Sequence, residues 1–193
     1  MNITELLTEK EKACLIYKDL KKDEVLFHEN DVCEYVGIIM KGRVFIISYL
    51  SDGKEIIYNT LEKDQLFGNN LIFSSVPYYK GDIIAQSDSL IALIGKDDLL
   101  KILQNNKNFL KEYLKIQSDS SKILNDRIRL LSISSAEERF LYFMHENRNR
   151  VSYDSIEQLA RQMYLTRETL TRLLRRLESN NSIIRENKVI ILK

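Results

Sequence analysis

Cysteine and histidine are scarce in this sequence, and their scarcity argues against much metal and redox chemistry. Only two cysteines and two histidines occur among 193 residues. Cys14 and Cys33 form no CxxC pair, cannot supply the four thiolates of an iron–sulfur cluster, and fit a reducing compartment. His28 and His145 are too few for most imidazole-built metal sites. We therefore expect no metal, no cofactor and no enzymatic activity, with both cysteines buried as small apolar residues and His28 at the surface.

Long hydrophobic runs are also missing. The longest, such as residues 90–94, hold about five residues, whereas a membrane span needs about 20. No basic stretch followed by an apolar one opens the sequence, so a secretory leader is not expected. Hydrophobic residues still make up 44% and charged residues 30%, which is enough to bury a core. These features predict a cytoplasmic globular protein without membrane contact.

Charge is nearly balanced overall but unevenly distributed. Residues 1–134 carry 18 Lys and Arg against 20 Asp and Glu, and residues 135–193 carry 11 against 8. Within residues 161–193 the count is 8 against 3, a net charge of +5, and six of these eight are arginines. A basic end on a nearly neutral chain indicates either a polyanion partner or a solvated helix face, and charge alone does not choose between them.

Between residues 24 and 94 the sequence alternates short apolar stretches with turn residues. The expected strands are rich in Ile, Val, Phe and Tyr and cover residues 25–27, 35–40, 43–49, 55–60, 81–85 and 89–94. Lys41-Gly42 and Asp52-Gly53 are typical turn pairs between them. This pattern indicates an antiparallel barrel or sandwich. Residues 1–20 are expected to form a short helical lead-in.

A long helix is expected over residues 108–131, after a first helix that starts near Asp97 and Asp98. One side of the long helix repeats in steps of four and three, at Leu110, Leu114, Gln117, Ser121, Leu124, Ile128 and Leu131. This heptad seam either packs on the chain's own β domain or pairs with a second copy, and its narrowness and length favour the dimer. The polar pair Gln117 and Ser121 either faces a small molecule or sets the register of the dimer.

Residues 135–193 read as three helices and a hairpin. Apolar spacing predicts helices at residues 136–146, 155–163 and 166–177, followed by strands at 182–184 and 189–192. This order describes a winged helix-turn-helix. The chain is therefore divided into a β domain at residues 1–96, a dimerisation region at 97–134 and a DNA-binding domain at 135–193.

The third of these helices carries the chemistry of nucleic-acid recognition. Its leucines occupy one side, and Thr166 can cap its first turn. Arg167, Glu168 and Arg172 supply two forks for guanine and a carboxylate for cytosine, as base reading in the major groove requires. The residues expected to hold phosphates are Thr171, Arg175, Arg176 and Lys188. The alternative is a helix whose charges only solubilise it; Glu168 favours base reading, because phosphate binding gains nothing from a carboxylate.

At these residues the sequence resembles the family of bacterial regulators typified by the cyclic-AMP receptor protein and FNR. Residues 166–172 (TRETLTR) resemble the recognition-helix motif that reads a TGTGA-like half-site, and residues 136–139 (AEER) resemble the junction before the DNA domain. The strings at 41–44 (KGRV), 52–55 (DGKE) and 67–68 (FG) match turns of its cyclic-nucleotide-binding-like domain. The resemblance spans roughly residues 20–193. It implies an α+β fold: an N-terminal antiparallel β-roll (double-stranded β-helix), a long dimerisation helix and a C-terminal winged helix-turn-helix.

Three departures from the family pattern matter. Members that bind cyclic AMP place Glu after Phe-Gly and Arg-Ser further on, whereas this chain has Asn69-Asn70 and Tyr78-Tyr79-Lys80. Lysine lacks the bidentate fork of arginine, so cyclic AMP is not the expected effector. The cysteine cluster of oxygen-sensing members and a haem ligation pattern are missing. Tyr164 stands where the family's turn usually has glycine, so that turn is either strained or different, with a slightly altered angle between its helices.

The sequence therefore predicts a homodimeric, sequence-specific DNA-binding transcription regulator. Its partners would be double-stranded DNA, a second copy, an unidentified small-molecule effector and, as a further candidate, RNA polymerase. The candidate effector pocket comprises Gly68, Asn69, Asn70, Leu71, Tyr78, Tyr79, Lys80, Gln117 and Ser121. The alternative is an effector-independent regulator whose β domain is only a structural dimer or partner module. A cupin-like metalloenzyme is not favoured, because His28 is the only histidine in the barrel.

Overall fold

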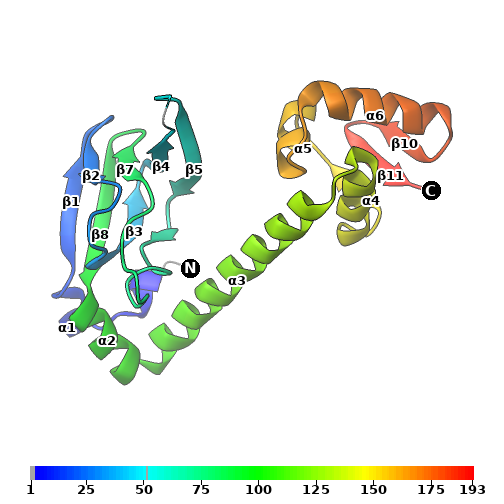
Figure 1. Ribbon diagram of the computed structural model, residues 1–193. Coiled ribbons are helices and arrows are strands. Elements are labelled where there is room, and N and C mark those ends of the chain that lie inside the picture. Colours follow the sequence, from blue (N-terminus) through cyan, green and yellow to red (C-terminus); the bar gives the residue numbers. More distant parts are fainter. Residues whose placement is uncertain (1–2, 51) are drawn as a thin grey trace. The chain divides into compact units, whose positions relative to one another are not determined.

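A computed structural model describes residues 3–50 and 52–193 of the chain (Figure 1). The chain divides into two compact units, the first ending at Ser118 and the second running from Asp119 to Lys193. The long helix α3 (Lys107–Ser132) contributes residues to both units. None of the helices in the described part of the chain is long and apolar enough to cross a membrane.

The first unit is built from two four-stranded antiparallel sheets, ordered β1-β8-β3-β6 and β2-β7-β4-β5. Their strands are β1 (Ile16–Leu20), β2 (Val25–Phe27), β3 (Tyr35–Lys41), β4 (Arg43–Tyr49), β5 (Glu55–Glu62), β6 (Leu66–Phe67), β7 (Asp82–Ala85) and β8 (Ser89–Gly95). The expected β-rich domain is present, in the form of these two sheets. The six expected strands are all found, within one or two residues of their predicted ends.

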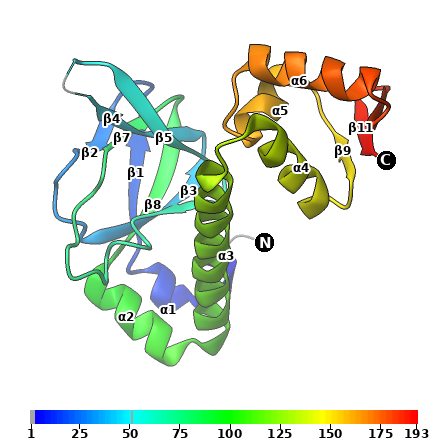
Figure 2. The same ribbon diagram turned by 45° about the vertical axis from the view of Figure 1, so that its right-hand side comes forward.

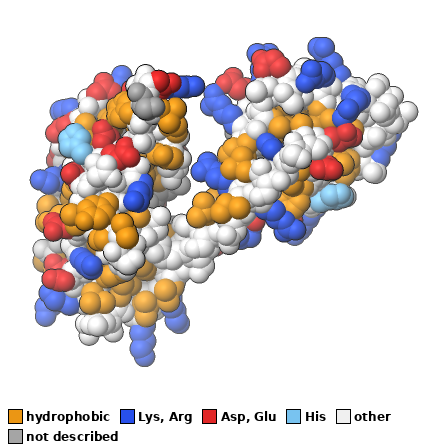
Figure 3. Space-filling view, viewed as in Figure 1, with side chains coloured by type: hydrophobic (Ala, Val, Ile, Leu, Met, Phe, Trp, Pro, Cys, Tyr) orange, Lys and Arg blue, Asp and Glu red, His pale blue; other side chains and the backbone are white. Residues whose placement is uncertain are grey.

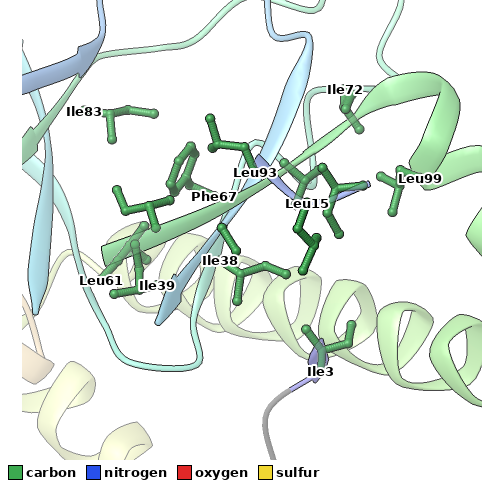
Figure 4. Close-up of a cluster of buried hydrophobic side chains, with 14 of the residues drawn as sticks. Ile3, Leu15, Ile38, Ile39, Leu61, Phe67, Ile72, Ile83, Leu93 and Leu99 are labelled. Carbon is green, nitrogen blue, oxygen red and sulfur yellow. The ribbon is translucent and has the colours of Figure 1, made fainter. Parts of the chain in front are cut away.

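One hydrophobic core lies inside the first unit, and both sheets contribute to it. Ile38 and Leu93 come from one sheet, and Leu61 and Ile83 come from the other. Figure 4 shows these side chains together with Phe67, the buried residue of the two-residue strand β6. Burial alternates along β7, whereas β3 and β8 each bury four consecutive residues around Ile38 and Leu93, so both faces of these two strands are covered there.

The predicted lead-in helix over residues 1–20 is wrong in its second half. A 3₁₀ turn η1 (Ile3–Leu6) and one helical turn α1 (Glu9–Lys12) are present, but residues 16–20 form strand β1. β1 pairs along its whole length with β8, from Ile16 opposite Leu93 to Leu20 opposite Ser89. This pairing joins segments about 70 residues apart, and local sequence does not reveal it. The short strands β6 and β9 (Arg150–Ser152) were also not predicted.

Helix α2 (Lys96–Asn105) begins beside Asp97 and Asp98, as predicted, and is followed by α3. Within the first unit, Phe109 and Tyr113 of α3 are buried in the core of the sheets. Other large apolar side chains of α3 remain exposed, namely Leu114, Ile123, Leu124, Ile128 and Leu131. Four of these five belong to the predicted heptad seam.

The second unit contains three short helices and a three-stranded antiparallel sheet of order β10-β11-β9 (Figure 2). Its further elements are α4 (Ala136–Glu146), α5 (Ile156–Gln162), α6 (Arg167–Ser179), β10 (Ile183–Glu186) and β11 (Val189–Leu192). Its core joins Phe140 and Met144 of α4 to the leucines of α6 and to Ile183 and Ile190 of the sheet. The three helices and the hairpin lie where the sequence predicted them.

Candidate nucleic-acid interface

Helix α6 is fixed at its start by a capping hydrogen bond and along its length by leucines. Thr166 has extended backbone angles, and its hydroxyl accepts a hydrogen bond of 3.1 Å from the main-chain NH of Thr169. This is the N-cap that the sequence predicted. Leu170, Leu173, Leu174 and Leu177 are all buried in the core of the unit. Because these leucines are immobilised, the opposite face of the helix has a defined direction.

The opposite face of α6 presents unpaired charges. The side chains of Arg167, Glu168, Arg172 and Arg175 are exposed, and no hydrogen bond or ion pair to another described residue holds any of them. Thr171 is half-buried, and its hydroxyl donates to the carbonyl of Arg167 at 2.7 Å. In the space-filling view, Lys and Arg side chains project from the edge of the second unit along which α6 runs (Figure 3). The face therefore offers free guanidinium donors and one free carboxylate.

Two of the predicted phosphate-binding residues lie in more constrained settings. Arg176 Nη2 forms an ion pair with Glu137 Oε2, which stands in the first turn of α4. Lys188 lies in the turn between β10 and β11, where both Asn187 (φ 48°) and Lys188 (φ 60°) are left-handed. This turn directs Lys188 into solvent from the end of the hairpin. A further cavity of about 360 Å³ lies between the start of α4 and α6, with Ser135, Thr169 and Arg172 in its lining.

Tyr164, in the turn between α5 and α6, keeps the left-handed backbone that glycine usually provides there. Its φ is 53°, so of the two alternatives for this turn the strained one is realised. The Leu165 NH donates to the carbonyl of Ala160 at 2.9 Å and closes the turn. The Tyr164 hydroxyl accepts a hydrogen bond from Arg127 Nε of α3, and that guanidinium lies 5.2 Å from the centre of the tyrosine ring.

Arg139 makes main-chain contacts that sequence reasoning missed. Its guanidinium donates two hydrogen bonds to the carbonyl of Ile133, at 3.1 and 2.6 Å, and others to Tyr164 at 3.0 Å and Met163 at 3.4 Å. One side chain thus joins the segment between α3 and α4 to the turn that precedes α6. The AEER string marked this position as a junction, but the partners of Arg139 lie up to 25 residues away and left no local signal.

The predicted effector pocket is partly closed by the chain itself. Asn69 is buried, and its main-chain carbonyl accepts hydrogen bonds from Tyr113 Oη at 3.0 Å and Gln117 Nε2 at 2.7 Å. Its side-chain amide donates to Gln117 Oε1. Gln117 therefore meets Asn69 of the β domain, while contact with a small molecule and a role in the dimer register both stay predictions. Ser121 is exposed and lies in the second unit.

The remaining pocket residues do not all converge. Tyr79 is buried, its ring stacks on Phe27 at 4.8 Å, and its hydroxyl donates to the carbonyl of Tyr35 at 2.9 Å. Gly68 approaches it closely, because a β-carbon on Gly68 would lie 3.4 Å from the Tyr79 ring. Burial raises the pKa of Tyr113 to about 12 and also raises the pKa of Tyr79, so both phenols stay neutral donors at neutral pH. Asn70, Tyr78 and Lys80 are exposed, and Leu71 is half-buried.

A cavity of about 510 Å³ lies elsewhere in the first unit, near the start of α2. Its lining includes Cys14, Cys33, Glu34, Tyr35 and Lys96. Cys33 is buried, as predicted, but Cys14 is exposed, because it follows the single turn of α1 instead of lying inside a longer helix. His28 is exposed as expected. Among the described residues, no group of three or more His, Cys, Asp or Glu side chains is placed to hold a metal ion.

Sequence comparison matches parts of the chain to a family model and to a curated relative. Residues 17–106 match the family model of the cyclic nucleotide-binding domain. A curated relative, the anaerobic regulatory protein of Bacillus subtilis, is 26% identical over 112 residues, which are 58% of this chain and 47% of that protein. The match thus spans about half the length of that relative.

Solved structures resemble almost the whole chain. A CooA mutant from Carboxydothermus hydrogenoformans has a TM-score of 0.65 at 20% identity, covering 100% of this chain and 92% of that one. The catabolite activator protein of Thermus thermophilus has a TM-score of 0.59 at 15% identity, covering 99% and 93%. At these identities the likeness is one of fold.

Proposed function

We propose, from the Crp/Fnr family of bacterial regulators to which all of these matches point, that this chain regulates transcription by binding a specific DNA sequence as a homodimer. The β domain at residues 1–96 would be the sensory or structural part, residues 97–134 the dimerisation region, and residues 135–193 a winged helix-turn-helix. The target would be a palindrome of TGTGA-like half-sites. Two recognition helices about 34–36 Å apart would enter successive major grooves of such a site.

The outer face of α6 is the observation that carries this proposal. Arg167, Glu168 and Arg172 are exposed and unpaired within the described residues, while the leucines behind them are buried. A helix that only solubilises the protein would also carry exposed charges, but neither that role nor phosphate binding calls for a carboxylate among the arginines, as Glu168 provides. A helix that reads base edges needs them free, with arginine forks for guanine and a carboxylate for the amino group of cytosine.

Dimerisation is supported by the exposed seam of α3. Leu124, Ile128 and Leu131 are 55%, 55% and 52% exposed, at successive heptad positions. Three large apolar side chains in one line along a helix are costly to leave in water and are typical of a coiled-coil contact. A dimer through this seam would cover them and would bring two copies of α6 to one DNA site.

Binding of the full chain to labelled duplexes tests the proposal. Fluorescence anisotropy compares a palindrome carrying two TGTGA half-sites with a scrambled duplex of equal length and composition, at several salt concentrations. Tighter binding to the palindrome is expected. Replacement of Arg172 by Ala should cost about 1–3 kcal/mol on the palindrome and relax the base preference. Equal affinity of the wild-type chain for both duplexes would overturn sequence-specific binding.

Arg175→Ala serves as the matched control, because it removes the same charge from the same helix at a position expected to contact phosphate. It should weaken binding to both duplexes alike and lower the slope of log affinity against log salt by about 1. If Arg172→Ala behaved in this same uniform manner, Arg172 would be a phosphate contact and the base-reading assignment would be wrong.

A second candidate function is an effector-independent regulator whose β domain is only a structural or partner module. The contact between Asn69 and Gln117 favours it, because the buried residue after Phe67-Gly68 is satisfied by the chain's own α3. A thermal-shift screen of the full chain with cyclic AMP and other cyclic nucleotides separates the two candidates. A ligand that binds the folded state raises the unfolding midpoint by mass action. A dose-dependent rise with any of these nucleotides would exclude the effector-independent reading.

A further inference from the structure

The turn between α5 and α6 has a strained residue, Tyr164, at a position where glycine would adopt the same backbone without strain. Glycine adopts a φ near 53° freely, whereas a residue with a β-carbon pays about 1–2 kcal/mol in this region. Other left-handed residues of this unit are mostly Asn, which tolerates the conformation. Tyr164 is bulky and aromatic, and it is 37% exposed, so burial in the core does not account for it. A strained residue at this position points to a role for its side chain.

The side chain of Tyr164 reaches the last part of α3. Its hydroxyl accepts a hydrogen bond from Arg127 Nε, and its ring lies under the same guanidinium at 5.2 Å. One arginine therefore holds both the polar end and the face of the ring, which restricts the tyrosine in two directions. The two residues are 37 positions apart in the sequence, so the contact joins two elements that the chain does not otherwise connect directly.

The main chain of the same turn is held separately. Arg139 donates to the carbonyls of Met163 and Tyr164 and, with its other nitrogens, to the carbonyl of Ile133 between α3 and α4. These bonds satisfy carbonyl groups that a left-handed turn leaves open. Thr166, two residues after Tyr164, is the N-cap of α6. The start of α6 is thus within two residues of a turn that two arginines hold.

The position of Arg127 relates this contact to the dimer seam. Arg127 precedes Ile128 and lies three residues after Leu124 and four before Leu131, so it flanks the row of exposed apolar residues. In the heptad of a coiled coil, such a flanking position lies beside the partner helix. A change in how two copies of α3 pair would therefore act directly on the arginine that holds Tyr164.

We propose that Tyr164 is a positioning residue, through which Arg127 sets the direction of α6 relative to the dimerisation helix. The proposal rests on the DNA-binding function proposed above. Tyr164 strains the backbone of the turn, but its side chain connects α6 to the part of α3 that carries the exposed seam. Without it, α6 keeps its fold but the unit loses one of the two arginine contacts that orient it, and two copies fit a palindrome less well.

Tyr164→Gly tests this, because the positioning role predicts a loss of DNA affinity that is larger than any change in stability. Glycine relieves the left-handed backbone but loses both contacts to Arg127 and makes the unfolded chain more flexible, so these effects offset and the thermal unfolding midpoint of the full chain should change little. Affinity for the palindrome should nevertheless fall about tenfold, the change that 1.4 kcal/mol produces. Tyr164→Phe keeps the ring under Arg127 but loses the hydroxyl, and its affinity should lie between those of the wild type and Tyr164→Gly. A merely structural turn would instead show no loss of affinity in Tyr164→Gly.

Asn149→Gly is the matched control, since Asn149 is also left-handed (φ 60°) and lies in the turn after α4. It should leave DNA affinity unchanged. In the double variant Arg127→Gln with Tyr164→Gly, the loss of DNA affinity should not exceed that of Tyr164→Gly alone, because both changes remove the same contact. Additive losses, or wild-type affinity in Tyr164→Gly, would overturn the positioning role. Failure of the wild-type chain to prefer the palindrome would instead overturn the proposed function.

Discussion

Gln117 both donates a hydrogen bond to Asn69 and accepts one from it. Its Nε2 donates to the main-chain carbonyl of Asn69 at 2.7 Å, and its Oε1 accepts from the Asn69 side-chain amide. Asn69 is only 9% exposed, so these groups depend on protein partners and not on water. The turn after β6 is thereby tied to α3 inside the first unit. The residue that the family pattern would offer to a ligand is here bound to the chain's own long helix.

Replacement of Gln117 by Ala should destabilise the first unit. The Asn69 amide would lose its acceptor, and a buried donor left without a partner costs about 1–3 kcal/mol. Urea unfolding followed by circular dichroism measures the loss. Gln104→Ala removes an exposed glutamine from α2 and should change stability by less than about 0.5 kcal/mol. Equal stability of both variants would mean that the Asn69 contact contributes nothing to folding.

Charges placed on the seam of α3 should separate the dimer. Glutamate at both Leu124 and Ile128 would bury four carboxylates in a two-chain contact, a cost that a coiled coil does not tolerate. Light scattering after size exclusion should then report the monomer mass in place of twice that value. Ile123→Glu makes the same kind of change at a residue that is 68% exposed and off the seam, so it should leave the dimer intact. A dimer that survives the double replacement would place its interface elsewhere.

The two cysteines should differ sharply in reactivity. Burial is the largest cause that raises the pKa of the Cys33 thiol, so less of it is thiolate at neutral pH. Cys14 is exposed. Brief treatment of the folded chain with iodoacetamide, followed by peptide mass spectrometry, should label Cys14 and spare Cys33. Both should be labelled in denaturant. Labelling of Cys33 at the rate of Cys14 in the folded chain would contradict its burial.

Two left-handed glycines give a matched pair for testing the turn after β6. Gly68 has a φ of 74°, and a β-carbon there would lie 2.6 Å from the carbonyl oxygen of Tyr35. Gly53 has a φ of 80°, with no described atom within 4 Å of such a carbon. Gly53→Ala should therefore cost only the strain of the backbone, about 1–2 kcal/mol. Gly68→Ala adds a backbone clash and should cost about 3 kcal/mol or more in urea unfolding. Equal costs would indicate that the backbone near Tyr35 yields freely.

Helices and strands could be predicted where apolar residues recur at short intervals, because such patterns depend only on residues near one another in the sequence. The leucines of α6 recur every three to four residues, and Thr166 lies at the start of their run, so both the helix and its N-cap followed from the pattern. The same holds for the seam of α3 and for the strands, whose apolar stretches are bounded by turn residues such as Gly42 and Gly53. Strand β1 escaped prediction, because its partner β8 lies about 70 residues away and supplies the hydrogen bonds that make it a strand.

Sequence by itself determined which side of α6 carries arginines and which carries leucines, because a helix assigns residues to faces through its period alone. It also determined that a costly tyrosine occupies the turn before α6. Only the tertiary structure decided that Tyr164 meets Arg127, 37 residues away, and that Asn69 meets Gln117, 48 residues away. Such pairs depend on how whole elements pack, and a hydrogen bond between distant residues leaves no periodic trace in the chain that forms it.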